Sequence, residues 1–401
     1  MPSRRDRVAV VVDDARTRRW PRRIGIALTA ALILFFGGGG WYFSGLIRTD
    51  ALLVEEHPPE YDFTVTGVSP ESITFTLPGT PPADLLSSET LGVRWEDGYG
   101  LSGPVLSRTD EAIAKQFTLV AGTLPTPGTT AAFEANAVPP DPADAGISYE
   151  TVTYVSAFGE FDAWLTPGNM AGTWAIFIHG RGATPHEGIR ILPAFADRGI
   201  PMLLIDYRND PGAPATDDHL ATFGIGERED LEGAVAYALD HGAEGVVLVG
   251  YSMGGAIAMG FLYESDLADE VGAVILDAPA LELGAMVDAR AADTSLPLLP
   301  FKVPVMLTAA AKWMAGWRFG ADWSGMDYLD ERAAGLTVPI LVLHGVEDDT
   351  VPIALSRELA DRLPGIVELV EFPGAGHVRS WNVDPTRYDA AVAAFLDRVA
   401  G

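Results

Sequence analysis

The chain has 401 residues, enough for two or three folded units, and carries a formal net charge of −28 with no cysteine. The acidity argues against a nucleic-acid partner, because phosphate binding needs a basic face, and the lack of cysteine excludes disulfides and a thiolate nucleophile. The seven histidines include no H-E-x-x-H pattern or other close ligand cluster, so the sequence predicts no catalytic metal.

The amino-terminal segment is basic and is followed by a long uncharged run. Eight arginines and three aspartates give residues 1–23 a net charge of +5, so the remaining chain carries −33. Residues 24–47 contain no charged side chain and have three aromatic residues near their far end. A run of this length can span a bilayer as a helix, and the arginines favour a cytoplasmic amino terminus. We therefore predict a transmembrane signal-anchor at 24–47, which would place everything after Arg48 outside the cytoplasm.

Two other interpretations of this run remain open. A cleaved signal peptide with its apolar core at 26–36 would give a secreted protein, although no A-x-A-like cleavage site follows it. The second interpretation is that the run forms a core helix of a soluble domain. The run of four glycines at 37–40 weakens any helix prediction, since each glycine costs about 1 kcal/mol relative to alanine.

Residues 48–146 are predicted to form a separate, β-rich extension. Residues 73–77 alternate apolar and polar side chains as a half-buried strand does, and Pro78-Gly79 ends that pattern. Prolines concentrated between 125 and 142 indicate a linker. Further strand candidates are Tyr61 to Val68, Thr90 to Trp95 and Phe117 to Val120.

From Ile147 onward, apolar strand patterns alternate with helical ones. Residues 149–156 and 160–166 are predicted to form a hairpin, and residues 227–239 have apolar side chains at helical spacing. Such alternation predicts a mostly parallel sheet covered on both faces, with a functional site at the carboxyl ends of the strands. The other predicted strands are Trp174 to Ile178, Pro201 to Asp206, Gly245 to Val249, Ala273 to Asp277, Ile340 to Leu343 and Ile366 to Phe372.

One stretch, residues 281–335, interrupts this alternation with prolines and aromatic residues and no clear strand. An insertion at this point would form a cap over the site. The side chains of Trp313, Trp317 and Trp323 could then line an apolar substrate pocket, or they could only pack the cap onto the sheet.

The segment Gly250-Tyr251-Ser252-Met253-Gly254 follows a predicted buried strand and precedes a segment rich in small helix formers. Glycines two residues on either side of the serine permit a tight turn that exposes the hydroxyl at the carboxyl edge of the sheet. An incidental serine in a glycine-rich turn is the alternative. The strand, the turn and the helix are all where a nucleophile requires them, which favours Ser252 as the nucleophile.

A serine hydroxyl needs a base and a carboxylate that orients that base. His377 is the best base candidate, because it lies in a glycine-rich loop after the last predicted strand. Asp348 is the preferred carboxylate, since it follows an apolar strand and precedes Val351-Pro352, and its neighbours Asp349 and Glu347 are weaker candidates.

Two backbone amides are needed to stabilise an oxyanion. Met253, directly after the serine, is predicted to supply one, and Arg181 in the loop after residues 174–178 the other. The Arg181 side chain could bind an anionic part of the substrate or form an exposed salt bridge. His179 and His344 are interpreted as packed histidines that orient their loops rather than as bases.

These motifs resemble the α/β-hydrolase family over residues 147–401. The match rests on His179-Gly180-Arg181-Gly182, the turn around Ser252, the block from His344 to Pro352 and Gly376-His377, in the family's order of Ser, Asp and His. Residues 206–210 and 226–231 look similar to bacterial hydrolases of the prolyl-oligopeptidase and dienelactone-hydrolase branches. This resemblance implies an eight-stranded sheet, an acyl-enzyme mechanism and no cofactor.

Two features depart from the family pattern. The amino-terminal β region is too short for a seven-bladed propeller, which counts against an oligopeptidase, and a membrane anchor is not a general feature of the family.

The sequence thus predicts a membrane-anchored, extracytoplasmic serine hydrolase that uses Ser252 to cleave a small-molecule acyl substrate, an apolar ester. A peptidase or amidase, and an acyltransferase with the same triad, are alternatives within the same chemistry. A catalytically silent binding protein on a hydrolase fold is an alternative of a different class. The acyl chain length and the oligomeric state are not specified by the sequence.

Overall fold

The computed structural model describes residues 15–55, 61–77, 83–134, 137–169, 172–296 and 301–399. The chain divides into two compact units, Met1–Ala51 with Ala291–Gly320 and Leu52–Arg290 with Ala321–Gly401. The predicted cap is therefore split, because its central part groups with the amino-terminal segment. Most of the basic tail, the strand end at Pro78-Gly79 and the prolines at 297 and 300 lie outside the described residues.

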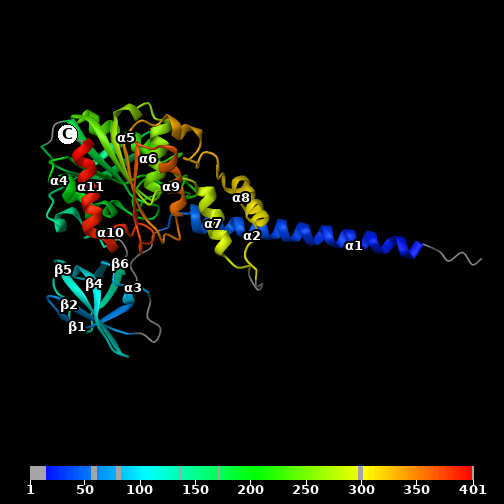
Figure 1. The fold of residues 1–401 in the computed structure, drawn as a ribbon, viewed down its shortest axis with the longest axis horizontal. Helices are drawn as coiled ribbons and strands as arrows, with labels where there is room; N and C mark the ends of the chain where they lie inside the picture. The colour runs from blue at the N-terminus through cyan, green and yellow to red at the C-terminus, as the bar shows by residue number, and fades with distance from the viewer. Residues whose placement is uncertain are drawn as a thin grey trace, which may run out of the picture. The chain divides into compact units, whose positions relative to one another are not determined.

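The first unit is helical. Its amino-terminal helix runs through four consecutive segments, α1 (Ala15–Ile33), the π-helix η1 (Leu34–Gly38), α2 (Gly39–Leu46) and the π-helix η2 (Ile47–Leu52). Within it, Arg22–Leu52 is long and apolar enough to cross a membrane (Figure 1, blue). The second segment of this unit contains the end of α7 (Leu283–Asp293) and the whole of α8 (Val305–Phe319).

Six antiparallel strands of the second unit form a closed barrel in the order β1-β2-β5-β4-β3-β6. Its apolar core includes Val65, Phe75 and Phe117, all fully or almost fully buried. Strands β4 and β6 were not anticipated from the sequence. The bounds are β1 (Phe63–Ser69), β2 (Ser72–Thr76), β3 (Leu91–Trp95), β4 (Gly98–Arg108), β5 (Ala112–Gly122) and β6 (Thr130–Glu134).

The rest of this unit is built on an eight-stranded sheet in the order β14-β13-β12-β11-β9-β10-β8-β7, which confirms the predicted sheet. Strands β9 to β14 run parallel, and β8 is antiparallel to both of its neighbours. The bounds are β7 (Glu150–Val155), β8 (Glu160–Thr166), β9 (Gly172–Ile178), β10 (Met202–Ile205), β11 (Ala243–Tyr251), β12 (Val271–Asp277), β13 (Ile340–Gly345) and β14 (Val367–Phe372).

Helices cover both faces of this sheet (Figure 1). On one face, apolar side chains of α4 (Leu192–Ala196) and α11 (Pro385–Val399) share a core with the strands. The other face carries α5 (Arg228–Asp240), α6 (Met253–Glu264) and α9 (Ile353–Arg362). The remaining short helices are α3 (Ala83–Leu86), η3 (Pro142–Ala145), η4 (Pro185–Ile191), η5 (Ala268–Glu270), η6 (Glu331–Gly335) and α10 (Ser380–Val383).

The central strands are buried on both faces, as parallel strands covered by helices must be. All four residues of β10 and all six of β13 are buried. Because the parallel strands end at one edge, the loops that follow β9, β11, β13 and β14 meet there. These four loops hold the residues predicted to form the catalytic triad and to donate to the oxyanion.

Candidate active site

Ser252 occupies the turn between β11 and α6 in a strained backbone conformation, with φ +49° and ψ −112°. The residues two positions before and after it must be glycines. A Cβ on Gly254 would lie 2.0 Å from the carbonyl oxygen of Ile178, and one on Gly250 would lie 2.6 Å from that of Gly254. The turn is fixed by hydrogen bonds, because the Ser252 amide donates to the Asp277 carbonyl (2.9 Å).

The structure brings together the three residues predicted to form a catalytic triad. His377 Nε2 lies 2.8 Å from Ser252 Oγ, and His377 Nδ1 lies 2.8 Å from Asp348 Oδ2. Oγ therefore donates to Nε2 while Nδ1–H donates to the carboxylate. This chain of hydrogen bonds leaves Nε2 ready to accept the serine proton.

Asp348 is a buried carboxylate surrounded by donors. Its Oδ1 accepts from the amides of Thr350 (2.9 Å) and Val351 (2.8 Å). Burial by itself would raise the pKa of Asp348, but hydrogen bonds from His344, His377 and Val351 outweigh it and hold the pKa well below its usual range. Asp348 is therefore ionised near neutral pH.

His344 also contacts the Asp348 carboxylate. Its Nε2 lies 3.0 Å from the Val351 carbonyl oxygen and 3.3 Å from Asp348 Oδ2, so Nε2 carries the proton. Its Nδ1 then accepts from the Ser356 hydroxyl at 2.7 Å. His344 is fully buried, and it orients the loop as the sequence analysis proposed.

The loop that carries His377 is held at several points. The Glu347 carboxylate accepts from the Gly374 amide at 2.5 Å. On the far side of His377, Asn382 Nδ2 donates to the Thr90 carbonyl of the barrel (2.7 Å), and the Thr90 amide donates to the Asn382 carbonyl (3.0 Å). The barrel thus contacts the segment that positions the imidazole, a role the sequence did not reveal.

The two predicted oxyanion donors lie beside Ser252. Met253 begins α6, where the first amides of a helix have no intrahelical acceptor. A Cβ on Gly180 would lie 3.2 Å from Ser252 Cβ, so the loop that contains Arg181 passes next to the serine. The Gly180 amide donates to the buried Glu187 carboxylate (2.7 Å), which leaves Arg181 as the better donor from this loop.

The Arg181 side chain has a structural partner. Its Nη1 donates to the Leu53 carbonyl at 2.6 Å. The segment 52–54 also pairs with residues 219–221, because the Val54 amide donates to the His219 carbonyl (3.0 Å) and the Ala221 amide to the Leu52 carbonyl (2.8 Å). The guanidinium therefore ties residues 52–54 to the candidate oxyanion loop.

His179 is a buried ion-pair member rather than a second base. Its Nε2 faces Asp210 Oδ2 (2.9 Å), its Nδ1 faces the Gly180 carbonyl (2.8 Å), and its ring stacks on Tyr207. Burial opposes the charge, but the Asp210 carboxylate and the Gly180 carbonyl outweigh it and raise the pKa of His179 to about 9.

His179, Asp206 and Asp210 also offer ligand atoms within 4.8 Å of one another, a spacing that could suit a metal ion. A metal needs an unprotonated ring nitrogen, whereas both nitrogens of His179 face acceptors. The donor set therefore fits an imidazolium–carboxylate pair better than a metal site.

The raised pKa of His179 predicts that the protein becomes less stable as the pH rises into the alkaline range. The charged form is favoured in the folded state, so its contribution is complete below pH 6.5 and is lost as pH rises through about 9. The free energy of unfolding should drop by about 3 kcal/mol across that interval. Urea unfolding at pH 6, 7.5 and 9.5 tests this. His179→Gln should flatten the profile and the exposed His241→Gln should not, and a flat wild-type profile would contradict the assignment.

Behind Ser252 lies a buried ion pair that the sequence analysis did not single out. Arg190 Nη2 donates to Asp277 Oδ2 (3.3 Å), and the Tyr388 hydroxyl donates to the same oxygen (2.8 Å). Both charged side chains are almost completely buried, at 0% and 1% exposure. Because the Asp277 carbonyl accepts the Ser252 amide, this pair anchors the turn.

Arg190→Met should destabilise the protein by about 3–5 kcal/mol, because it leaves the Asp277 carboxylate buried without its counter-charge. Urea unfolding followed by tryptophan fluorescence measures this change. The matched control is Arg357→Met, whose partner Glu371 is exposed, and it should cost no more than about 1 kcal/mol. Equal losses in the two variants would mean that the buried pair does not hold the turn.

The three tryptophans predicted to line a pocket are not alike. Trp313 and Trp317 lie on α8 in the first unit and are 69% and 71% exposed, which does not fit the lining of a closed pocket. Trp323 is half-buried in the second unit.

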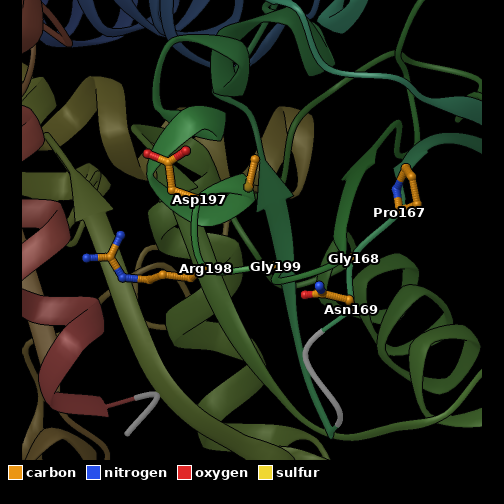
Figure 2. A pocket seen from close by; sticks show the side chains of 7 residues that line it. Pro167, Gly168, Asn169, Asp197, Arg198 and Gly199 are labelled. Atoms are coloured by element: carbon orange, nitrogen blue, oxygen red, sulfur yellow. The ribbon is translucent and has the colours of Figure 1, made fainter.

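A shallow pocket lies at the other edge of the sheet (Figure 2). It occurs where β8 ends and β10 begins, away from the strand ends that carry Ser252 and His377. Its one arginine, Arg198, bonds the Asp397 carboxylate at 2.6 Å. The lining offers no pair of nucleophile and base. Its residues are Pro167, Gly168, Asn169, Ala196, Asp197, Arg198 and Gly199.

A doubly covered, mostly parallel sheet with a serine at the turn after a central strand defines the class of α/β hydrolases. The family model described as "Alpha/beta hydrolase family" matches residues 175–393, more than half of the chain. The chain therefore belongs to the alpha/beta hydrolase family.

The chain shares about a quarter of the aligned residues with each of two bacterial relatives. The chain is 26% identical over 243 residues to a monoacylglycerol lipase of Mycolicibacterium smegmatis, a match that covers 54% of this chain and 85% of the relative. It is 25% identical to the AB hydrolase superfamily protein YisY of Bacillus subtilis, covering 50% and 84%. An esterase structure from Pyrococcus furiosus superposes with a TM-score of 0.51 at 20% identity, over 65% of this chain and 95% of the other, and supports the fold alone.

Proposed function

We propose that the protein is a membrane-anchored serine esterase that forms an acyl-enzyme on Ser252. The observation that carries this proposal is the aligned chain of hydrogen bonds from Ser252 Oγ through His377 to Asp348, each 2.8 Å long. The lipase name of the Mycolicibacterium smegmatis relative favours a carboxylic ester over an amide.

The proposed reaction has two steps. Ser252 Oγ attacks the acyl carbon while His377 Nε2 takes its proton, the Met253 and Arg181 amides hold the oxyanion, and Asp348 stabilises the imidazolium. The proton then passes to the leaving alkoxide as the carbon–oxygen bond breaks. Water attacks the acyl-enzyme with His377 as base, and the carboxylic acid and free Ser252 are released.

The direct test is hydrolysis of p-nitrophenyl esters, from acetyl to long acyl chains, by the full chain in detergent. We expect turnover and labelling by a fluorophosphonate, with the adduct mapped by mass spectrometry to Ser252. Ser265→Ala, a change at a buried serine at the end of α6, should leave labelling intact. A folded protein that neither turns over esters nor reacts with the probe would overturn the proposal and leave a binding role.

We also propose that residues 24–47 anchor the protein with its hydrolase unit outside the cytoplasm. The helix Arg22–Leu52 is apolar and largely exposed, and the arginines before it favour a cytoplasmic amino terminus. Protease added to intact spheroplasts should digest the hydrolase unit. Its protection until the membrane is permeabilised would reverse the orientation.

A further inference from the structure

Helix α8 packs one of its faces against the amino-terminal helix. Its buried residues Leu307, Ala311 and Ala315 recur every four positions and so form one stripe. Leu307 belongs to a small apolar cluster with Phe36 and Phe43 of the amino-terminal helix. The first unit is therefore a pair of packed helices.

The contact accounts for the last two of the four glycines at 37–40 that weakened the helix prediction. A Cβ on Gly39 would lie 2.9 Å from Leu307 Cδ1, and one on Gly40 would lie 3.1 Å from Met314 Sδ. Glycine at these two positions lets the helices approach closely, as small residues do between helices in membranes. Arg318 fixes the far end, since it stacks 3.6 Å from the Trp41 ring centre and donates to Ser44 Oγ (2.7 Å).

The opposite face of α8 is apolar and has no protein partner among the described residues. Val305, Met306, Trp313 and Trp317 are 83%, 71%, 69% and 71% exposed, and the neighbouring Phe301 is 64% exposed. Exposed apolar groups gathered on one face mark an interaction site. The amino-terminal helix has the same character, with Leu28, Ile33 and Leu34 all more than half exposed.

The charge of this segment indicates what the exposed face of α8 contacts. Residues 301–320 contain Lys302, Lys312 and Arg318 and no acidic residue, in a chain whose net charge is −28. Two of these cations lie on α8 with the tryptophans and aliphatic side chains, and Lys302 lies just before it. This composition suits a lipid surface with anionic headgroups. At 15 residues, α8 is about 22 Å long, too short to cross a hydrocarbon core of about 30 Å.

We infer that α8 is a second membrane element, which lies beside the amino-terminal helix and inserts the face formed by Val305, Met306, Trp313 and Trp317 into the lipid bilayer. This inference rests on the proposed anchor. It assigns to Trp313 and Trp317 a lipid contact in place of the substrate pocket predicted from the sequence. The lipid is the environment of the helix and is not assigned here as a substrate.

The absence of cysteine makes a direct test possible. Met306→Cys, Leu28→Cys and Asp240→Cys are each labelled with the fluorophore NBD in the full chain and reconstituted into vesicles of phosphatidylcholine and phosphatidylglycerol. Met306 tests the α8 face, Leu28 reports the anchor, and the exposed Asp240 at the end of α5 is the aqueous control. Retained hydrolysis of p-nitrophenyl acetate verifies the fold of each labelled variant.

We expect nitroxide-labelled lipid to quench the probes at Met306 and Leu28, and aqueous iodide to quench only the probe at Asp240. Lipid quenching at Leu28 with iodide quenching at Met306 would leave the anchor standing and overturn the inference. Protection of Met306 from both quenchers would indicate that a protein or a second copy covers the face, and would also overturn it. Iodide quenching at both positions would refute the anchor and the inference together. Lipid quenching at Met306 with iodide quenching at Leu28 would also overturn the inference as stated, because it would remove the anchor on which the inference rests.

Discussion

Ser252→Ala should lower kcat for ester hydrolysis by a factor on the order of 10⁶, because it removes the only group that forms the proposed acyl-enzyme. The fold should survive, since the backbone contacts of Ser252 are retained and a methyl group occupies less space than the hydroxymethyl group. Steady-state hydrolysis of p-nitrophenyl butyrate measures the loss of turnover. Fluorophosphonate labelling in parallel measures the loss of the nucleophile.

The control for this experiment is Ser265→Ala, which alters a serine outside the site and should keep both readouts. Residual turnover by the Ser252 variant above the rate in water would reflect the oxyanion donors and substrate binding. Labelling and turnover that persist in Ser252→Ala would assign the chemistry to another residue.

Asp348→Asn should lower kcat by about 10⁴. An asparagine oxygen can keep the hydrogen bonds from Thr350 and Val351, but its amide group must then face His377 Nδ1. An N–H donor at that place selects the tautomer with the proton on Nε2. The imidazole then cannot accept the proton of Ser252.

Asp349 provides a matched control for this variant. It is exposed and adjacent, so Asp349→Asn changes the same charge by the same chemistry and should leave kcat within a factor of a few. Measured kcat values for the two variants test this difference, and circular dichroism spectra verify that both variants are folded. Comparable losses in both would show that the loop charge matters and that Asp348 has no special role.

The sequence favours Asp348 by its position after an apolar strand, but contacts in the folded chain distinguish it from other aspartates at the same edge of the sheet. Asp206 follows β10, Asp277 is the last residue of β12 and Asp348 lies in the loop after β13, and parallel strands bring all three to one edge. Asp277 is engaged by Arg190 and Tyr388, whereas Asp348 faces His377. Which carboxylate reaches the imidazole depends on helices that lie far away in the chain.

The barrel contains a strand that local sequence preferences did not predict. Strand β4 contains glycines and Pro104, which disfavour a strand when local propensity alone is considered. It forms because pairing with β3 and β5 closes the barrel and satisfies its backbone groups. The contacts of Thr90 with Asn382 likewise join residues 292 positions apart.

The sequence by itself determined the alternation of strands and helices, the glycine turn at Ser252 and the order of Ser252, Asp348 and His377 along the chain. These features are local, since they depend on the spacing of apolar residues and on glycines where a β-carbon would collide. Tertiary structure alone decided that Arg190 and Asp277 form a buried pair, that Gly39 and Gly40 face α8, and that Trp313 and Trp317 remain exposed. These features depend on burial and on contacts between segments that are distant in the chain. Such contacts leave no periodic pattern in the sequence from which they could be predicted.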